Sequence, residues 1–378
     1  MHWVALKMLM GDRLKYLGII FGVAFAALLI AQQSAIFRGV MQMTASRIAD
    51  VAEPDIWVMN RTVQHIDDIQ PLSENALYRV RGVSGVAWAA RFYKSQARAR
   101  LADGNFQQMT LLGLDDATLV GAPRQMLLGS LDDLRQPDAV VMDEAGYAHL
   151  WPDEPRALGR IFEMNDRRAV LVGICKASLS FEGFPILYAR YSQAVLYAPS
   201  ERKVLSFILV KGQDGVPVAE VCQRIREQTG LKALSRDEFA WTTIAYYWEK
   251  TGIPLNFGIT VLLGFLVGVA IAGQTFYTFT LENLKQFGAL KAMGLSNTRL
   301  VGMILLQALV VGSIGYGLGV GLAALFGELT HGSAKLAFFM PWQVLLVTAG
   351  AVLAIVMLAS LLSIRRVLVL EPAIVFRG

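Results

Sequence analysis

The fold of this chain follows from its apolar runs, the clearest of which occupies positions 255–280 and reads LNFGITVLLGFLVGVAIAGQTFYTFT. This run contains no Lys, Arg, Asp or Glu. A hydrocarbon core about 30 Å thick needs roughly 20 apolar residues in a helix that rises about 1.5 Å per residue. We therefore expect residues 255–280 to form a helix that crosses a membrane.

Three further runs have the same character, and they extend over Tyr16–Phe37, Leu300–Phe326 and Trp342–Ile364. Charged residues make up only 17% of the 378-residue chain, whereas about 25% is usual in soluble domains. The sequence thus predicts an integral membrane protein with four transmembrane helices, the third at about 298–327 and the fourth at about 342–364. A cleaved signal peptide is an alternative for the first run, although that run is long for one.

Basic residues beside these runs indicate the orientation of the chain, because Lys and Arg are enriched in cytoplasmic flanks. Arg38 and Lys335 are the only basic residues in the short flanks on one side. The other side carries nine, which are Lys7, Arg13, Lys15, Lys285, Lys291, Arg299, Arg365, Arg366 and Arg377. We expect both termini in the cytoplasm of a bacterium, the chain in its inner membrane, and residues 41–253 and 328–340 outside.

The positions before the first run have apolar residues at helical spacing, and this pattern indicates an interfacial helix within residues 1–40. An ordinary basic flank is the alternative. The net charge of +5 does not favour nucleic-acid binding, because its distribution is uneven. Residues 41–253 hold 24 Lys/Arg and 26 Asp/Glu, whereas the membrane-associated remainder holds 11 and 4.

Residues 41–253 combine strand and helix signals, and they predict an α+β domain, possibly of two subdomains, inserted between the first and second membrane helices. Helices are expected at 73–80 and at 216–229, the latter ending at Gly230. Two stalk helices, at 37–52 and 239–251, lead to the membrane; an aromatic belt without a mechanical role is the alternative for the second. Strands are expected at 55–59, 85–90, 109–114, 139–142, 169–174, 194–197 and 207–210.

No catalytic or metal-binding pattern stands out in this domain. His65 and His149 are far apart in the sequence and lack the spaced Cys/His partners of a zinc site. The adjacent aspartate pairs lie in polar stretches that are typical of solvated loops. Cys175 and Cys222 are the only cysteines. They form either a disulfide, which an oxidising compartment permits, or two buried thiols.

The segment 282–296, which reads ENLKQFGALKAMGLS, separates the second and third membrane helices. Apolar residues at helical spacing, such as Leu284 and Phe287, predict a short amphipathic helix over 282–294 on the cytoplasmic face. Gly294 is placed to end this helix, and Ser296 to begin the next. Such a helix between two long ones would suit a lever moved by a cytoplasmic partner; a plain surface loop is the alternative.

The pattern E-x-x-K-Q-F-G-A-L-K-A-M-G-L-S resembles the coupling segment of FtsX/MacB-type (type VII) ABC transporter permeases, and the ending LEPAxVFRG resembles their DevC branch. The resemblance covers the whole four-helix plan, and it implies a homodimer that binds a separate ABC ATPase, works with a membrane-fusion protein and contacts membrane lipid. It implies mechanotransmission, in which ATP-driven motion exports or extracts a hydrophobic or amphipathic substrate. The coupling-helix residues implied are Glu282, Lys285, Phe287, Gly288, Lys291 and Gly294.

The sequence contains no Gly-x-x-x-x-Gly-Lys-Ser/Thr motif, so we expect ATP and magnesium on the partner chain, with no cofactor, metal or enzymatic activity on this one. Glycines four residues apart in the membrane runs indicate close helix packing, within one chain or across a dimer. These are Gly264, Gly268, Gly315, Gly317, Gly319 and Gly321.

Two other functions share these features. One is an FtsX-like regulator that activates an extracellular hydrolase without transport, although such regulators usually have a smaller outer domain. The other is a membrane receptor, which would have no need of the 282–294 helix. No residue cluster selects a substrate.

Overall fold

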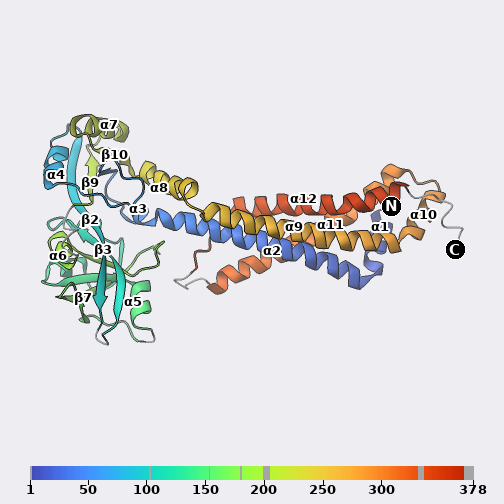
Figure 1. Cartoon of the computed structure of the whole chain (residues 1–378), viewed down its shortest axis with the longest axis horizontal. Helices are drawn as coiled ribbons and strands as arrows, with labels where there is room; N and C mark the ends of the chain where they lie inside the picture. Colours follow the sequence, from blue (N-terminus) through green and yellow to red (C-terminus); the bar gives the residue numbers. More distant parts are fainter. Residues whose placement is uncertain are drawn as a thin grey trace. The chain divides into compact units, whose positions relative to one another are not determined.

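The computed structural model describes residues 2–101, 104–152, 154–178, 181–198, 205–330 and 336–369. The chain divides into two compact units (Figure 1), one made of Met1–Val40 with Gly252–Gly378 and the other of Met41–Thr251. The inserted unit therefore ends two residues before the predicted boundary at 253. Lys335 and the ending at 370–378 lie outside the described residues.

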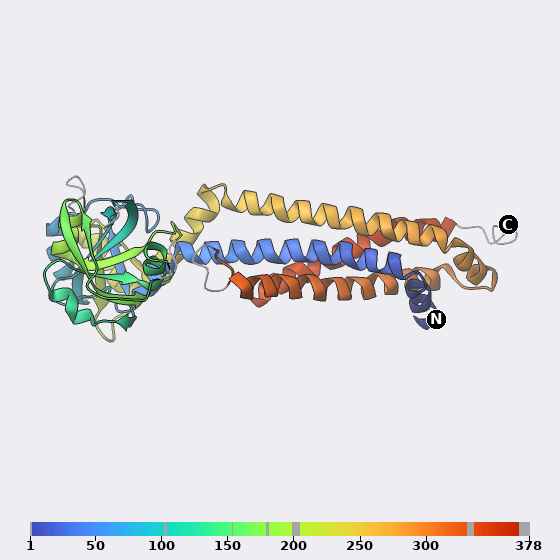
Figure 2. The same ribbon diagram turned by 90° about the horizontal axis from the view of Figure 1, so that it is seen from below.

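The first unit is helical, and its described residues include four helices long and apolar enough to cross a membrane. They are α2 (Arg13–Thr44), α9 (Ile253–Glu282), α11 (Asn297–Thr330) and α12 (Trp342–Val369). Figure 2 shows α2 lying lengthwise beside α9 and α11. Buried residues of all four helices form one core, which includes Val23, Phe276, Val311 and Ile355.

Glycines allow α2 to lie close to its neighbours. A Cβ added at Gly319 of α11 would lie 2.5 Å from the carbonyl oxygen of Ala24, and one at Gly268 of α9 would lie 2.5 Å from Cβ of Ala26. Gly264 and Gly315 likewise face α2. Gly317 and Gly321 differ, because among the described residues nothing approaches within 4 Å of an added Cβ. Packing within the chain therefore accounts for four of the six predicted glycines, and the other two lie on an exposed face.

The inserted unit is built on a ten-stranded sheet in the order β10-β1-β9-β2-β3-β8-β5-β7-β4, with β6 (Ile161–Met164) paired to β2 and β7. The first half of the sheet consists of four antiparallel strands, which are β1 (Ile56–Met59), β2 (Val86–Arg100), β9 (Phe207–Gly212) and β10 (Lys232–Ser235). The helices α4 (Glu74–Arg81) and α7 (Val218–Thr229) contribute to its core. This is a split β-α-β arrangement.

The second half is inserted between β2 and β9 in the sequence. It contains β3 (Phe106–Leu114), β4 (Gln125–Leu128), β5 (Ala139–Asp143), β7 (Arg167–Lys176) and β8 (Ile186–Arg190), with the helices η1 (Leu131–Arg135), α5 (Glu144–Leu150) and α6 (Tyr191–Tyr197). The pairs β3–β8 and β5–β7 are parallel, so the sheet is mixed. The unit is thus an α+β domain of two subdomains, and the long strand β2 belongs to both.

One predicted strand is wrong, because residues 194–197 lie in α6. Ala194 and Tyr197 are both buried, and their spacing of three places them on one face of that helix. A short apolar run such as AVLY does not distinguish strand from helix by its pattern alone. The other six predicted strands are present as β1, β2, β3, β5, β7 and β9, although β2 continues ten residues beyond the expected end at Ala90. The strands β4, β6, β8 and β10 were not predicted.

Both stalk helices are present. The first is formed by the end of α2, which continues to Thr44, and by α3 (Ser46–Asp50), and the second is α8 (Arg236–Lys250). Ser235 begins α8, accepting a hydrogen bond from the backbone N–H of Glu238, whose carboxylate accepts one from Ser235 N. Ile48 of α3 and Phe239 of α8 are both buried in one core cluster.

The disulfide alternative is wrong, because Cys175 and Cys222 are free thiols in different core clusters. Cys175 lies at the end of β7 and Cys222 in α7. Burial disfavours the thiolate, and it raises the pKa of Cys175 to about 12 and that of Cys222 to about 11. Both thiols are therefore protonated at neutral pH.

Candidate functional site

The predicted amphipathic helix is α10 (Leu284–Ala292), which follows the end of α9 after a single residue, Asn283. Gly294 has a φ of +89°, a left-handed conformation that a glycine adopts without steric cost. Its N–H donates to Lys291 O at 3.0 Å, and Leu295 N donates to Leu290 O at 3.1 Å. The helix therefore ends at the predicted glycine, and α11 begins directly after Ser296.

One face of α10 packs into the helical unit. Phe287 has no exposed surface, and it shares a core cluster with Ala5 of α1 (His2–Gly11), Met303 of α11 and Val367 of α12. Gly288 is also buried. Elements from both ends of the sequence thus hold α10 in place. Phe287 and Gly288 therefore lie on the packed face of α10.

The opposite face is exposed and mixes charge with apolar surface. Lys285, Gln286 and Gly294 are exposed, and Met293 retains 70% of its surface. Lys291 is half-buried, and its ammonium donates to the carbonyl oxygen of Leu368 in α12 at 3.0 Å. Of the six predicted residues, Glu282, Lys285 and Gly294 are therefore at the surface.

An ion-pair network links the end of α9 to the beginning of α2. Lys15 pairs with Glu282 and, at 2.8 Å, with Asp12. Both carboxylates are substantially exposed, so screening by water and salt keeps this contribution to stability small. Its structural consequence is that the last residue of α9 contacts the beginning of the first membrane helix.

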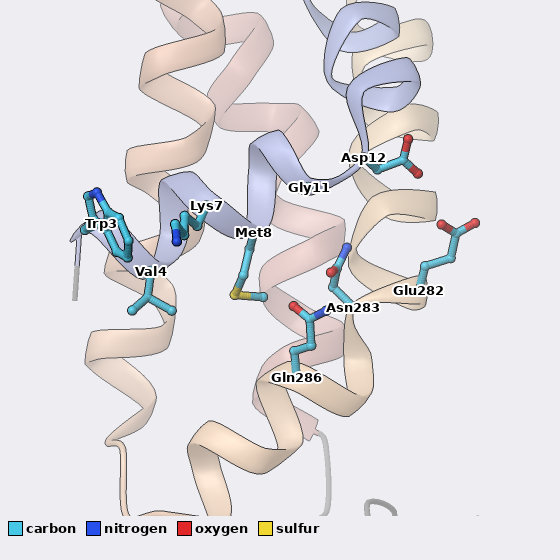
Figure 3. Close-up of a pocket in the computed structure, with 9 residues that line it drawn as sticks. All are labelled: Trp3, Val4, Lys7, Met8, Gly11, Asp12, Glu282, Asn283 and Gln286. Atoms are coloured by element: carbon cyan, nitrogen blue, oxygen red, sulfur yellow. The ribbon is translucent and has the colours of Figure 1, made fainter.

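A pocket of about 530 Å³ lies between α1 and the junction of α9 and α10 (Figure 3). Lys7 lies with its ammonium 4.0 Å from the ring centroid of Trp3, on the α1 side. The opposite wall contains Glu282, Asn283 and Gln286, and Met8 lies between the two sides in the close-up. The pocket combines charges of both signs with apolar surface, and it adjoins the exposed face of α10.

The sequence did not predict that α1 would pack beside α10. The helical spacing of apolar residues before Tyr16 indicated an interfacial helix, but it did not identify the buried Ala5 as a packing residue. The sequence did contain one signal for this packing, which was a polar residue within an apolar run, because a buried amide requires a hydrogen-bond partner. Gln307 is that residue, and it donates to Ala5 O at 2.7 Å.

This arrangement has the chemistry of a contact surface. Within the described ranges, no group of three His, Cys, Asp or Glu side chains could hold a metal ion. A short helix with one face packed and the other exposed can bind a partner and pass a displacement to the helices on either side of it. The fold and this site define a protein with four candidate membrane helices, a large inserted α+β domain and a short helix with one exposed face.

Two family models match the chain. The MacB-like periplasmic core domain matches residues 16–228, which is more than half of the chain, and the FtsX-like permease C-terminal domain matches residues 258–372. The chain belongs to the FtsX/MacB-type family of ABC transporter permeases. Its assignment to the DevC branch remains a prediction.

Among curated relatives, an uncharacterized ABC transporter permease of Mycobacterium tuberculosis is 24% identical over 225 residues, which is 59% of this chain and 59% of that protein. The putative hemin transport system permease protein HrtB of Staphylococcus haemolyticus is 23% identical over 150 residues, covering 40% of this chain and 41% of its own. The matched part therefore spans less than two thirds of these relatives. The solved periplasmic region of MacB from Actinobacillus actinomycetemcomitans is similar to this chain at 20% sequence identity and a TM-score of 0.39. The similarity covers 54% of this chain and 96% of that structure.

Proposed function

We propose that this chain couples ATP hydrolysis by a separate ABC ATPase, which binds ATP and magnesium, to motion of its inserted unit outside the cytoplasm. It does so in the inner membrane as a homodimer, with both termini and α10 on the cytoplasmic side. The motion exports or extracts a hydrophobic or amphipathic substrate together with a membrane-fusion protein. Haem is one candidate substrate, because a relative carries the name of a hemin transport permease.

The observation that carries the proposal is the two-sided character of α10. Its buried face, around Phe287, packs against helices from both ends of the chain, so a force applied to α10 acts on the helical unit as a whole. Its exposed face offers Lys285 and Met293 to a partner. The basic flanks support a cytoplasmic location for this face. The alternative function, an FtsX-like regulator without transport, would use α10 in the same way, so α10 supports the coupling and not the choice of substrate.

The test is co-purification of the chain with a co-expressed ABC ATPase, followed by measurement of ATP hydrolysis in nanodiscs. Lys285→Glu reverses a charge on the exposed face of α10 without disturbing its packed face. We expect it to reduce both co-purification and permease-dependent stimulation of hydrolysis at least severalfold. The matched control is Lys176→Glu, which makes the same change at an exposed position at the end of β7. Equal stimulation by wild type and Lys285→Glu would contradict the proposed role of α10.

A further inference from the structure

A buried ammonium group lies in the strand that the two subdomains share. The side chain of Lys94 in β2 is only 4% exposed, and its ammonium pairs with the carboxylate of Asp67. Asp67 lies in the segment that follows β1 and is itself 18% exposed. Removing two charges from water is costly unless they are paired with good geometry. An apolar residue would be an ordinary choice at this position, so the pair calls for a reason beyond filling the core.

The same carboxylate holds the last turn of α8. The hydroxyl of Tyr247 donates to Oδ2 of Asp67 at 3.0 Å, while the ammonium of Lys94 pairs with Oδ1. Tyr247 is 8% exposed. Burial and the neighbouring carboxylate raise the pKa of the Tyr247 hydroxyl, so it remains a hydrogen-bond donor throughout the physiological range. One carboxylate therefore connects a strand of the sheet with a stalk helix.

A contact from the second subdomain completes the surroundings of Tyr247. The ring of Phe181, which follows β7, lies 4.9 Å from the ring of Tyr247. Its neighbour Glu182 accepts a hydrogen bond from Nε2 of Gln96 in β2 at 2.9 Å. The end of α8 therefore touches the segment between β7 and β8 as well as the segment after β1.

The segment after β1 is itself held at several points. His65 stacks on Tyr246 of α8 with ring centroids 4.2 Å apart, and its Nδ1 accepts from Asp67 N at 3.3 Å. Lys232 of β10 donates to Val63 O at 2.7 Å. Asp67 is thus fixed by backbone contacts as well as by its two side-chain partners.

We propose that Lys94, Asp67 and Tyr247 are positioning residues that fasten the end of α8 to β2, so that a displacement of α8 moves both subdomains together. Apolar contacts can slide, whereas hydrogen bonds and ion pairs are directional and lose their energy when displaced. Since only two residues separate the end of α8 from the beginning of α9 at Ile253, chain connectivity makes α8 one entry point for motion from the helical unit. The proposal concerns transmission and rests on the proposed function for the origin of that motion.

The first measurement uses the full chain alone in nanodiscs and does not depend on an ATPase. Tyr247→Phe removes only the hydroxyl, and Tyr246→Phe is the matched control, since it keeps the ring that stacks on His65. Hydrogen–deuterium exchange over 60–70 should become roughly tenfold faster in Tyr247→Phe, because a hydrogen bond to a charged group is lost. It should not change in Tyr246→Phe. Equal exchange in Tyr247→Phe and wild type would overturn the proposal.

A second variant addresses the ion pair. Lys94→Met with Asp67→Asn replaces both charges, so no buried charge is left without a partner. We expect this double variant to fold and to show the same faster exchange over 60–70. Exchange at the wild-type rate in the folded double variant would contradict a fastening role for the pair.

The last measurement uses the complex with a co-expressed ABC ATPase, with and without Mg-ATP and vanadate. We expect nucleotide to alter exchange in β8 and α6 of the wild type, and Tyr247→Phe to lose most of that change while ATP hydrolysis continues. If nucleotide alters exchange in Tyr247→Phe as much as in the wild type, the fastening role is overturned while the proposed function stands. If nucleotide has no effect on the inserted unit of the wild type, the proposed function fails and the transmitting role fails with it.

Discussion

Gln307 of α11 donates a hydrogen bond of 2.7 Å to the carbonyl oxygen of Ala5 in α1, although 302 positions separate the two residues. Both residues are buried. Ala5 belongs to the same core cluster as Phe287 of α10. The N-terminal helix is therefore part of the structure that supports the proposed partner surface.

Gln307→Met tests this relationship, because the substitution keeps the length of the side chain and removes its amide. The bond contributes about 1 kcal/mol by ordinary values. Amide exchange in α1 should therefore become about fivefold faster, as measured by hydrogen–deuterium exchange in nanodiscs. The control is Gln274→Met at an exposed position of α9. Unchanged exchange in α1 would show that apolar packing alone holds this helix.

The glycines of α11 offer a matched pair of substitutions. Gly319→Val would force side-chain atoms against Ala24 and Ala27 of α2, and overpacking of this kind typically costs about 1–3 kcal/mol. Gly321→Val makes the same change where no described atom lies within 4 Å. We expect Gly319→Val to unfold at a lower temperature in detergent and Gly321→Val to resemble the wild type. Equal effects would contradict the packing of α11 against α2.

The two thiols should not react in the folded protein. At pH 8, maleimide should label neither Cys175 nor Cys222 in the native chain and both after denaturation, because pKa values of about 12 and about 11 leave almost no thiolate. Unfolded thiols ionise near pH 9, so between about pH 9 and 12 the unfolded state binds fewer protons than the folded state. The free energy of unfolding should therefore fall as the pH rises through this range. Single Cys→Ser variants assign the labels, and rapid native labelling would show that burial is incomplete.

His65 should make the inserted unit less stable in mild acid. Burial lowers the pKa of its imidazole, with Lys94 acting in the same direction, while Asp67 and Asp68 partly oppose the shift. The unfolded state takes up a proton near pH 6.5, so the stability from neutral His65 is complete above that pH and is lost as the pH falls through the lower folded-state pKa. Thermal unfolding of the full chain at pH 7 and pH 5 should show a larger loss for the wild type than for His65→Gln. An equal or larger loss in the variant would contradict this assignment.

The sequence by itself determined the membrane helices, their number and the α+β character of the inserted unit. Apolar runs of this length have few other structures open to them, since the backbone within a bilayer must satisfy its own hydrogen bonds. It also located α10, because a glycine after an amphipathic segment is a local signal that depends on few distant contacts.

Only the tertiary structure decided which residues of that helix are available to a partner. Phe287 and Gly288 lie inside because α1, α11 and α12 come together around them, and no local pattern encodes a contact between residue 5 and residue 307. The same holds for α6, where a four-residue apolar run became helical, and for Asp67, whose two partners come from distant parts of the sequence. Contacts between segments far apart in the chain depend on how elements pack, and packing follows from the shapes of all the side chains together.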